Sequence, residues 1–214
     1  MKEKLYDKEF YENQQQGSIR SARVVVGKIM NLIQPKSVVD IGCGVGTWLS
    51  VFEECGVSDY LGVDGEYVEK QMLKIPEAKF KAFDLKRSIA LNREFDLVVS
   101  LEVAEHLPPE NAETFIKTLT NLGPVVMFSA AIPYQGGVGH FNEQWPEYWQ
   151  EHFRKYGYVV FDAIRAKIWN DEAVEPWYRQ NIFLYVKENC IDNYPQLKKE
   201  TEGQQSLPLA LVHP

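Results

Sequence analysis

The stretch VVDIGCGVGTW, residues 38–48, decides the fold of this chain of 214 residues. With Ser37 in front, its first part is the run SVVDI, and a short run rich in valine predicts a buried parallel strand. The run passes directly into GCGVGTW, with glycine at positions 42, 44 and 46. A glycine-rich turn between a strand and a helix lets a ligand approach the backbone at the helix N-terminus. The stretch therefore predicts an α/β domain whose ligand lies at this turn.

The spacing of the glycines separates two classes of ligand that use such a turn. Dinucleotide-binding turns follow the pattern G-x-G-x-x-G, whereas here the third glycine comes one position early and Thr47 takes the last position. Asp40, just before the turn, would bring a negative charge close to a pyrophosphate, which is unfavourable, but it would attract an ammonium or a sulfonium. S-adenosylmethionine carries both cations and no phosphate, so the turn favours this cofactor.

From residue 35 onward the chain alternates between strand and helix, which is typical of parallel strands covered on both faces. Apolar runs predict strands at 37–41, 59–63, 79–83, 95–100, 124–131, 158–163 and 181–187. We expect helices at 5–17 (ending at Gly17), 19–33 (capped by Ser18), 46–55, 66–73, 109–122 and 145–156.

Acidic residues follow the ends of the next strands in register with the glycine turn. Asp64 ends the second strand, where a carboxylate can accept hydrogen bonds from ribose hydroxyls. Asp84 ends the third strand, where it can accept from an adenine amino group. Ser100, Leu101 and Glu102 end the fourth strand, beside the turn and under the methionine part of the cofactor.

With these landmarks the chain resembles the class I S-adenosylmethionine-dependent methyltransferases over about residues 20–188. The matching stretches are VVDIGCGVGTW (38–48), LGVDG (61–65), AFDL (82–85) and FDLVVSLEVAEHL (95–107). The resemblance implies a single α/β domain with a seven-stranded, mostly parallel Rossmann-like sheet, helices on both faces and an antiparallel last strand. A dinucleotide-binding domain, another doubly wound domain, or a methyltransferase-like fold without catalysis are the alternatives.

The resemblance implies three segments in the chain and one set of cofactor contacts. Residues 1–34 are expected to form N-terminal helices on the lid or substrate side, 35–188 the methyltransferase core, and 189–214 a polar C-terminal tail. Arg20 is a candidate partner of the methionine carboxylate. The expected cofactor-binding residues are Arg20, Asp40, Gly42, Gly44, Gly46, Asp64, Gly65, Asp84, Leu85, Ser100 and Leu101.

The residues after the fourth strand bear on the methyl acceptor. They read SLEVAEHLPPE and lack the [DN]PP[FY] motif of many DNA and protein N-methyltransferases. Glu102, Glu105 and His106 instead have the spacing i, i+3, i+4, so they can converge on one side of a turn. Two carboxylates and an imidazole suit Mg²⁺, Mn²⁺ or Zn²⁺. His140 follows in the glycine-rich loop after the fifth strand, at the same edge of the sheet.

This arrangement resembles the metal site of small-RNA terminal 2′-O-methyltransferases, in which the metal holds the two neighbouring hydroxyls of a ribose. The resemblance implies Glu102, Glu105, His106 and His140 as ligands of Mg²⁺ or Mn²⁺. The same E-x-x-E-H also occurs in class I methyltransferases that use no metal. There the first Glu frames the methionine pocket, and His106 or His140 becomes the candidate general base. The catalytic candidates are therefore His106, His140 and Glu102.

The segment SAAIPxQGGxGHxNEQWPxYW, residues 129–149, resembles methyltransferases of polysaccharide and glycan biosynthesis. It implies O-methylation of a sugar hydroxyl in a glycan or sugar conjugate, in company with glycosyltransferases. The alternatives are a small-RNA or other nucleic-acid 2′-O-methyltransferase, or a non-catalytic cofactor-binding domain of a glycan-assembly protein. Aromatic side chains that could stack on sugar rings are Tyr134, Phe141, Trp145, Trp149, Trp169 and Trp177.

Charge and cysteine content constrain partners and compartment. The chain has 23 Lys and Arg against 30 Asp and Glu, a net charge of −7, which argues against binding of nucleic acid by charge alone. The three cysteines form no disulfide framework, which suits a reducing compartment. The first residues show no secretory signal, and the longest apolar stretch, 125–132, is too short to span a bilayer. We therefore expect a cytoplasmic protein without a membrane span.

Overall fold

A single seven-stranded sheet organises the computed structural model, which describes residues 8–202 and 208–214. The strand order is β3-β2-β1-β4-β5-β7-β6, and the first five strands run parallel. β7 pairs antiparallel with both β5 and β6. The strands are β1 (Ser37–Ile41), β2 (Asp59–Asp64), β3 (Phe80–Ala82), β4 (Leu97–Leu101), β5 (Val125–Ser129), β6 (Tyr158–Phe161) and β7 (Phe183–Lys187). The expected α/β fold, with its antiparallel last strand, is confirmed.

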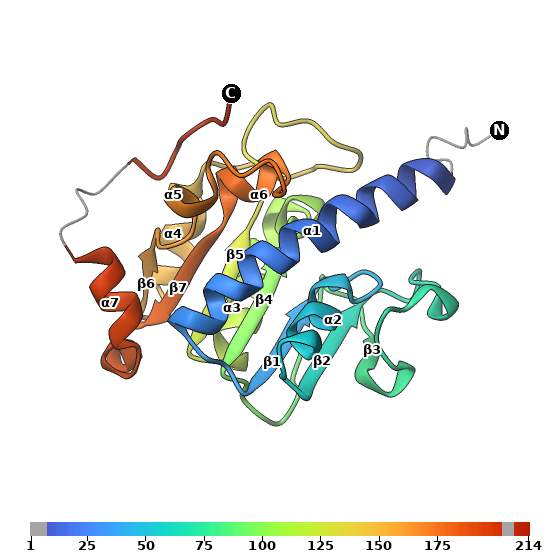
Figure 1. The fold of residues 1–214 in the computed structure, drawn as a ribbon, viewed down its shortest axis with the longest axis horizontal. Helices are drawn as coiled ribbons and strands as arrows, with labels where there is room; N and C mark the ends of the chain where they lie inside the picture. Colours follow the sequence, from blue (N-terminus) through green and yellow to red (C-terminus); the bar gives the residue numbers. More distant parts are fainter. Residues whose placement is uncertain (1–7, 203–207) are drawn as a thin grey trace.

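Helices cover both faces of the sheet (Figure 1). One hydrophobic cluster packs five helices on one face and a second cluster packs α3 and α4 on the other. Val38 belongs to the first cluster and Val39 to the second, because successive strand residues point to opposite faces. The helices are α1 (Lys8–Leu32), α2 (Thr47–Glu54), α3 (Ala112–Leu122), α4 (Pro146–Arg154), α5 (Arg165–Ile168), α6 (Pro176–Asn181) and α7 (Pro195–Thr201).

Lys8–Leu32 form one continuous helix, so the expected break at Gly17 with a cap at Ser18 is wrong. Residues 5–7 of the expected first helix lie outside the described residues. Position 17 requires a glycine because the side chain of Glu175 packs onto the helix at this point. A Cβ on Gly17 would lie 2.1 Å from Oε1 of Glu175. The hydroxyl of Ser21 donates to the Gly17 carbonyl at 2.8 Å and accepts the backbone N–H of Glu175 at 2.9 Å. The glycine thus serves a close contact rather than a helix end.

Two other segments differ from their expected form. Residues 66–73 contain only a 3-10 turn, Lys70–Met72, because none of them is buried and a helix there would have no apolar face to dock. The expected polar tail contains the 3-10 turn Glu188–Asn193 and α7, whose Leu197 is fully buried. Farther on, the carbonyl of Leu209 accepts a 2.7 Å hydrogen bond from Arg165.

The topology brings several chain segments together at one edge of the sheet. The carboxyl ends of β1, β2, β4 and β5 lie there, and so does the amino end of the antiparallel β7. Ligands of open α/β sheets bind outside the carboxyl ends of the parallel strands. Within the described residues, no helix is both long and apolar enough to cross a membrane.

Candidate active site

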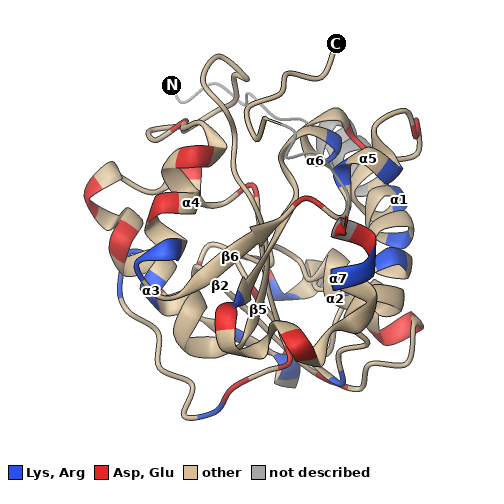
Figure 2. Cartoon of the chain, turned by 90° about the vertical axis from the view of Figure 1, so that its left-hand side faces the viewer, with Lys and Arg blue, Asp and Glu red and all other residues tan. Residues whose placement is uncertain are grey.

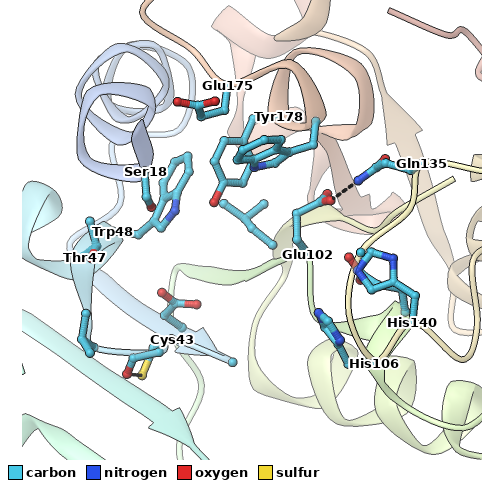
Figure 3. Close-up of a pocket in the computed structure, with 18 of the residues that line it drawn as sticks. Ser18, Cys43, Thr47, Trp48, Glu102, His106, Gln135, His140, Glu175 and Tyr178 are labelled. Atoms are coloured by element: carbon cyan, nitrogen blue, oxygen red, sulfur yellow. Dashed lines mark hydrogen bonds between the residues drawn. The ribbon is translucent and has the colours of Figure 1, made fainter. Parts of the chain in front are cut away.

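A cavity of about 970 Å³ opens along this edge of the sheet (Figure 3). One wall is the glycine turn after β1, and the opposite wall is made by the turn after β4 and the loop after β5. α1 and α6 close one side of the cavity. There Trp48 of α2 and Tyr178 of α6 meet edge to face, with ring centroids 5.1 Å apart. The cavity therefore joins the expected cofactor site to the expected acceptor site.

The glycines of the turn have different tasks. Gly42 and Gly44 both have positive φ, +87° and +53°, a region that side chains other than glycine rarely adopt. A Cβ on Gly42 would lie 2.3 Å from Cγ2 of Val103, so this glycine permits packing of the turn after β4. A Cβ on Gly44 would meet no atom within 4 Å, so this glycine faces the open cavity. Gly44 is thus the point at which a ligand can approach the backbone.

Asp64, at the end of β2, is buried and ties the glycine turn in place. Its Oδ2 accepts the N–H of Gly44 at 2.6 Å, and its Oδ1 accepts the N–H of Gly65 at 2.6 Å and the hydroxyl of Tyr67. Burial and the contact with Asp64 raise the pKa of the Tyr67 hydroxyl, which keeps it a donor. The ring of Tyr67 lies over Gly65, where a Cβ would be 2.1 Å from it.

Asp40 is buried at the base of the cavity, and no positive charge pairs with it among the side chains that the structure describes. Burial, and next the nearby charge of Asp64, raise the pKa of Asp40 well above its usual value. A cation placed in the cavity would reverse this effect, because an opposite charge favours the ionised carboxyl. This electrostatic setting fits a cationic ligand and disfavours a phosphate.

The other expected cofactor residues divide into three groups. Arg20 lines the cavity but pairs with Glu175 at 3.3 Å. Gly46 is the N-cap of α2, and Leu101 lines the cavity. Asp84, Leu85 and Ser100 lie off the cavity lining, as do Gly46, Asp64 and Gly65. Asp84 is exposed and accepts the N–H of Lys86, while Leu85 and Ser100 are buried.

The turn after β4 and the loop after β5 bring Glu105, His106 and His140 together. One ligand atom of each residue lies within 4.8 Å of those of the other two. The two imidazole rings meet edge to face, with centroids 4.7 Å apart (Figure 3). Nδ1 of His106 lies 3.1 Å from the Gly139 carbonyl, so it carries the proton and leaves Nε2 with a free lone pair.

Glu105 gives this cluster the character of a cation site. The side chain is fully buried, and neither carboxylate oxygen accepts a hydrogen bond of ordinary geometry from the described part of the chain. Burial, and next the charge of Glu102, raise the pKa of Glu105 well above its usual value. The backbone N–H groups of Glu105 and Ala131 only partly oppose this rise. A buried carboxylate with so little compensation is costly unless a cation or a proton is supplied. Two imidazole nitrogens and a carboxylate are ligands that Mn²⁺ and Zn²⁺ accept, so the donor set fits a divalent cation.

Glu102 lies outside this cluster of three. Its Oε2 accepts the amide of Gln135 at 2.9 Å and its Oε1 accepts the amide of Asn181 at 3.2 Å. Burial raises the pKa of Glu102, while these hydrogen bonds oppose the rise. Its backbone has φ +53°, a strained conformation for a residue other than glycine and typical of functional sites. Of the four residues that the sequence groups as ligands, the fold thus brings three together.

Two residues at the site are missing from the sequence prediction. Glu143 accepts a hydrogen bond from Nδ1 of His140 at 2.9 Å, and its only signal in the sequence is its position three residues later. Asn181 precedes β7, and because β7 is antiparallel, this residue lies at the same edge as those that follow β4 and β5. A polar pair before the last strand, Gln180 and Asn181, was the available signal.

The aromatic candidates for sugar stacking also divide. Tyr134 is 96% exposed, Phe141 69% and Trp145 39%, all in the loop after β5. Trp177 lines the cavity. Trp149 is 2% exposed and packs in the core against Phe128, so a stacking role for it is wrong. Trp169 instead contacts the ring of His213, with centroids 4.8 Å apart.

Comparison with known proteins relates the chain to a protein family by its sequence. The profile of a family described as a methyltransferase domain matches residues 11–180, most of the chain. No curated protein matches it in sequence.

Solved structures are similar in fold. The sugar N-methyltransferase KedS8 from Streptoalloteichus sp ATCC 53650 is 14% identical, with a TM-score of 0.64 over 83% of this chain and 91% of that one. The methyltransferase domain of bacterial CtHen1 is 20% identical, with a TM-score of 0.57 over 79% and 98%. Magnesium protoporphyrin IX methyltransferase from Synechocystis PCC 6803, solved with S-adenosylhomocysteine, is 17% identical, with a TM-score of 0.56 over 83% and 87%.

Proposed function

Since the chain belongs to the methyltransferase-domain family and is a class I S-adenosylmethionine-dependent methyltransferase, we propose that it methylates a hydroxyl oxygen of a sugar. The acceptor is a glycan or sugar conjugate, bound through two neighbouring hydroxyls with the help of a divalent cation. The observation that carries this proposal is the convergence of Glu105, His106 and His140 on the cavity wall opposite the glycine turn.

In this proposal the glycine turn and β2 bind the cofactor. Asp40 faces its cationic part, and Gly44 gives it access to the backbone. Asp64 accepts the ribose hydroxyls, which requires the hydroxyl of Tyr67 to leave Oδ1. Arg20 lies on the lining near Glu175 and is the candidate partner of the methionine carboxylate. Gly46, Gly65, Asp84, Leu85, Ser100 and Leu101 complete the proposed set.

Methyl transfer to oxygen needs a hydroxyl that can lose its proton, in line with the sulfonium methyl group. Glu105, His106 and His140 would hold a Mg²⁺ or Mn²⁺ ion, with Glu102 beside them as the remaining carboxylate of the motif. Such an ion, when bound, would make an acceptor hydroxyl easier to deprotonate and would help to hold a vicinal diol. The three protein groups orient the acceptor end of the cavity, and Glu102 can accept a hydrogen bond from the hydroxyl next to the reacting one.

The surroundings of the cavity support a neutral acceptor. The exposed rings of Tyr134, Phe141 and Trp145 lie in the loop that forms its outer wall and can stack on sugar faces. The net charge is −7, and on the side shown in Figure 2 basic residues are mixed with acidic ones rather than gathered in a stripe. Binding to nucleic acid depends on such a concentration of positive charge. We place the enzyme in the cytoplasm beside glycosyltransferases that supply the acceptor.

The decisive experiment is transfer of labelled methyl from S-adenosylmethionine to a panel of glycans and sugar conjugates, with linkage analysis of the product. An RNA with a free 2′,3′-diol end belongs in the panel. Label on a sugar hydroxyl supports the proposal, whereas label on RNA alone, with steeply salt-dependent binding, supports the 2′-O-methyltransferase. A protein that binds the cofactor but labels nothing is a non-catalytic domain.

The cation is tested in the same assay. We expect chelation to abolish transfer and added Mn²⁺ or Mg²⁺ to restore it. Glu105→Gln and His106→Gln should lose activity, whereas His152→Gln on α4, off the cavity lining, should keep it. Full activity in chelator would exclude the cation and leave His106 or His140 as general base.

A further inference from the structure

The loop between β5 and α4, residues 130–145, carries His140 and yet has no helix or strand of its own. Its path includes four residues with positive φ: Tyr134, Gly136, Gly137 and Gly139. A segment of this kind keeps a defined shape only where side chains replace the missing backbone hydrogen bonds. The contacts that define this loop therefore determine where His140 lies.

One carboxylate makes three of these contacts. Oε2 of Glu143 accepts the N–H of Tyr134 at 2.9 Å, and Oε1 accepts the N–H of Gly136 at 3.1 Å. Oε1 also accepts from Nδ1 of His140 at 2.9 Å. The side chain of Glu143, at the end of the loop, thus reaches back across it to the beginning. The hydrogen bond to His140, followed by those from the loop backbone, lowers the pKa of Glu143 against the effect of burial.

The bond to Glu143 also fixes which nitrogen of His140 is free. Because Nδ1 donates to a carboxylate, the proton of the neutral ring resides there, and Nε2 keeps its lone pair free for a ligand. A carboxylate behind an imidazole ligand fixes its tautomer and raises its basicity. The side chain of His140 is 12% exposed and that of Glu143 22%, so water competes only weakly for this bond.

The same loop contacts the other two members of the cluster. The carbonyl of Gly139 accepts from His106, which fixes that ring in the matching tautomer. The N–H groups of Phe141 and Asn142 donate to the carbonyl of Glu105 at 2.8 and 3.0 Å. The loop and the three candidate ligands therefore form one hydrogen-bonded unit.

We propose that Glu143 is a positioning residue that holds this loop over the cavity and, through the same carboxylate, presents Nε2 of His140 to a divalent cation. The part that concerns the cation rests on the proposed function. Binding of the cation and ordering of the loop are coupled through Glu143, so each strengthens the other.

Glu143→Gln and Glu143→Leu test this proposal, with Glu151→Gln, an exposed Glu on α4 that pairs with Arg154, as the control. A glutamine at 143 must turn its NH₂ group either toward His140, forcing the proton onto Nε2, or toward the N–H of Tyr134. Mn²⁺ is titrated by calorimetry, and hydrogen exchange is followed at the amides of Tyr134 and Gly136. Circular dichroism establishes that each variant is folded.

We expect Mn²⁺ to bind Glu143→Leu about 10–100-fold more weakly than the wild type, with a smaller loss for Glu143→Gln. Exchange at Tyr134 and Gly136 should be about tenfold faster in the cation-free Leu variant, and Mn²⁺ should slow it in the wild type. The Glu151→Gln control should match the wild type in both measurements.

Wild-type Mn²⁺ affinity and wild-type exchange in Glu143→Leu would overturn the proposal. If the wild type itself binds no Mn²⁺, the cation part of the proposed function fails together with the coupling. Exchange in the cation-free proteins then still decides whether Glu143 holds the loop.

Discussion

The side-chain amide of Asn181 donates a hydrogen bond to the carboxylate of Glu102 at 3.2 Å, although the two residues lie 79 positions apart. Gln135 donates to the other oxygen, and the amide of Gln180 donates to the oxygens of both Asn181 and Gln135. The backbone N–H of His213 donates to the oxygen of Gln180, which fixes the direction of the whole series. Both amide donors consequently face Glu102, which is held as a hydrogen-bond acceptor.

Asn181→Leu should therefore shift the pH dependence of transfer. The hydrogen bond from Asn181 opposes the effect of burial, so its removal raises the pKa of Glu102 further. Because the carboxylate form is the acceptor, the acidic limb of kcat/KM should move to higher pH. At a pH below that limb, kcat/KM of the variant should be about tenfold lower than that of the wild type, because a hydrogen bond to a charged group is usually worth about this much. A pH–rate profile with an unmoved limb would remove Asn181 from the site.

Asn181→Asp sharpens this measurement. It places a second carboxylate against Glu102, so the acidic limb should move farther than in Asn181→Leu. The order wild type, Leu, Asp along the pH axis is expected only if the charge on Glu102 matters. A purely structural role for Asn181 predicts no such order.

A second prediction concerns the effect of Asp64 and Tyr67 on cofactor affinity. Asp64→Asn should weaken binding of S-adenosylhomocysteine about tenfold or more, because the amide can no longer accept from Gly44 and Gly65 together. Tyr67→Phe keeps the ring over Gly65 but releases Oδ1 of Asp64, so its affinity should equal or exceed that of the wild type. Calorimetry decides between them, and a loss in Tyr67→Phe as large as in Asp64→Asn would contradict the ribose assignment.

A pair of glycine variants separates folding from binding. In Gly42→Ala the new methyl group adds a clash with Val103 to the strain of a positive φ, so the free energy of unfolding should drop by about 3 kcal/mol or more. In Gly44→Ala the methyl group enters open space, and strain alone costs about 1 kcal/mol. That methyl group occupies the approach to the backbone, so Gly44→Ala should lose cofactor affinity with little loss of stability. Thermal unfolding and calorimetry measure the two effects, and equal stability losses would contradict this division.

The sequence predicts the sheet well because its signals are local. The valine-rich run before Gly42 and the acidic residues that end the next strands show where parallel strands stop, and parallel strands stop at one edge. The helix breaks were less predictable, since Gly17 is set by the distant side chain of Glu175. No local pattern distinguishes a glycine that ends a helix from one that admits a neighbour.

Prediction of the candidate site from the sequence is limited in the same way, because it too rests on local signals. The spacing of Glu105 and His106 predicts their proximity, because they share one turn. The separation of Glu102 from that pair depends on Gln135 and Asn181, which reach it from two other segments. Long-range partners of this kind are fixed by the fold and leave no periodic trace in the sequence.

Asp40 gives a final prediction, on stability against pH. Its pKa is raised by burial in the folded protein, so the stability that it contributes is fully present below its unfolded value of 3.8 and is lost as pH rises through the folded value. Asp40→Asn lacks this titration. The two proteins should be about equally stable at the acidic end, and at neutral pH the cofactor-free variant should be more stable by about 1–3 kcal/mol.

Binding of the cofactor should stabilise the wild type more than the Asp40→Asn variant. A sulfonium or ammonium near Asp40 favours the ionised carboxyl, so binding compensates the charge that destabilises the empty protein. With saturating S-adenosylmethionine at neutral pH, the wild type should gain more in Tm than Asp40→Asn, because the variant binds the cation more weakly. Melting curves of both proteins across pH, with and without the cofactor, measure this. If the wild type is the more stable protein at neutral pH without cofactor, Asp40 has a compensating partner in the fold and is not reserved for a cation.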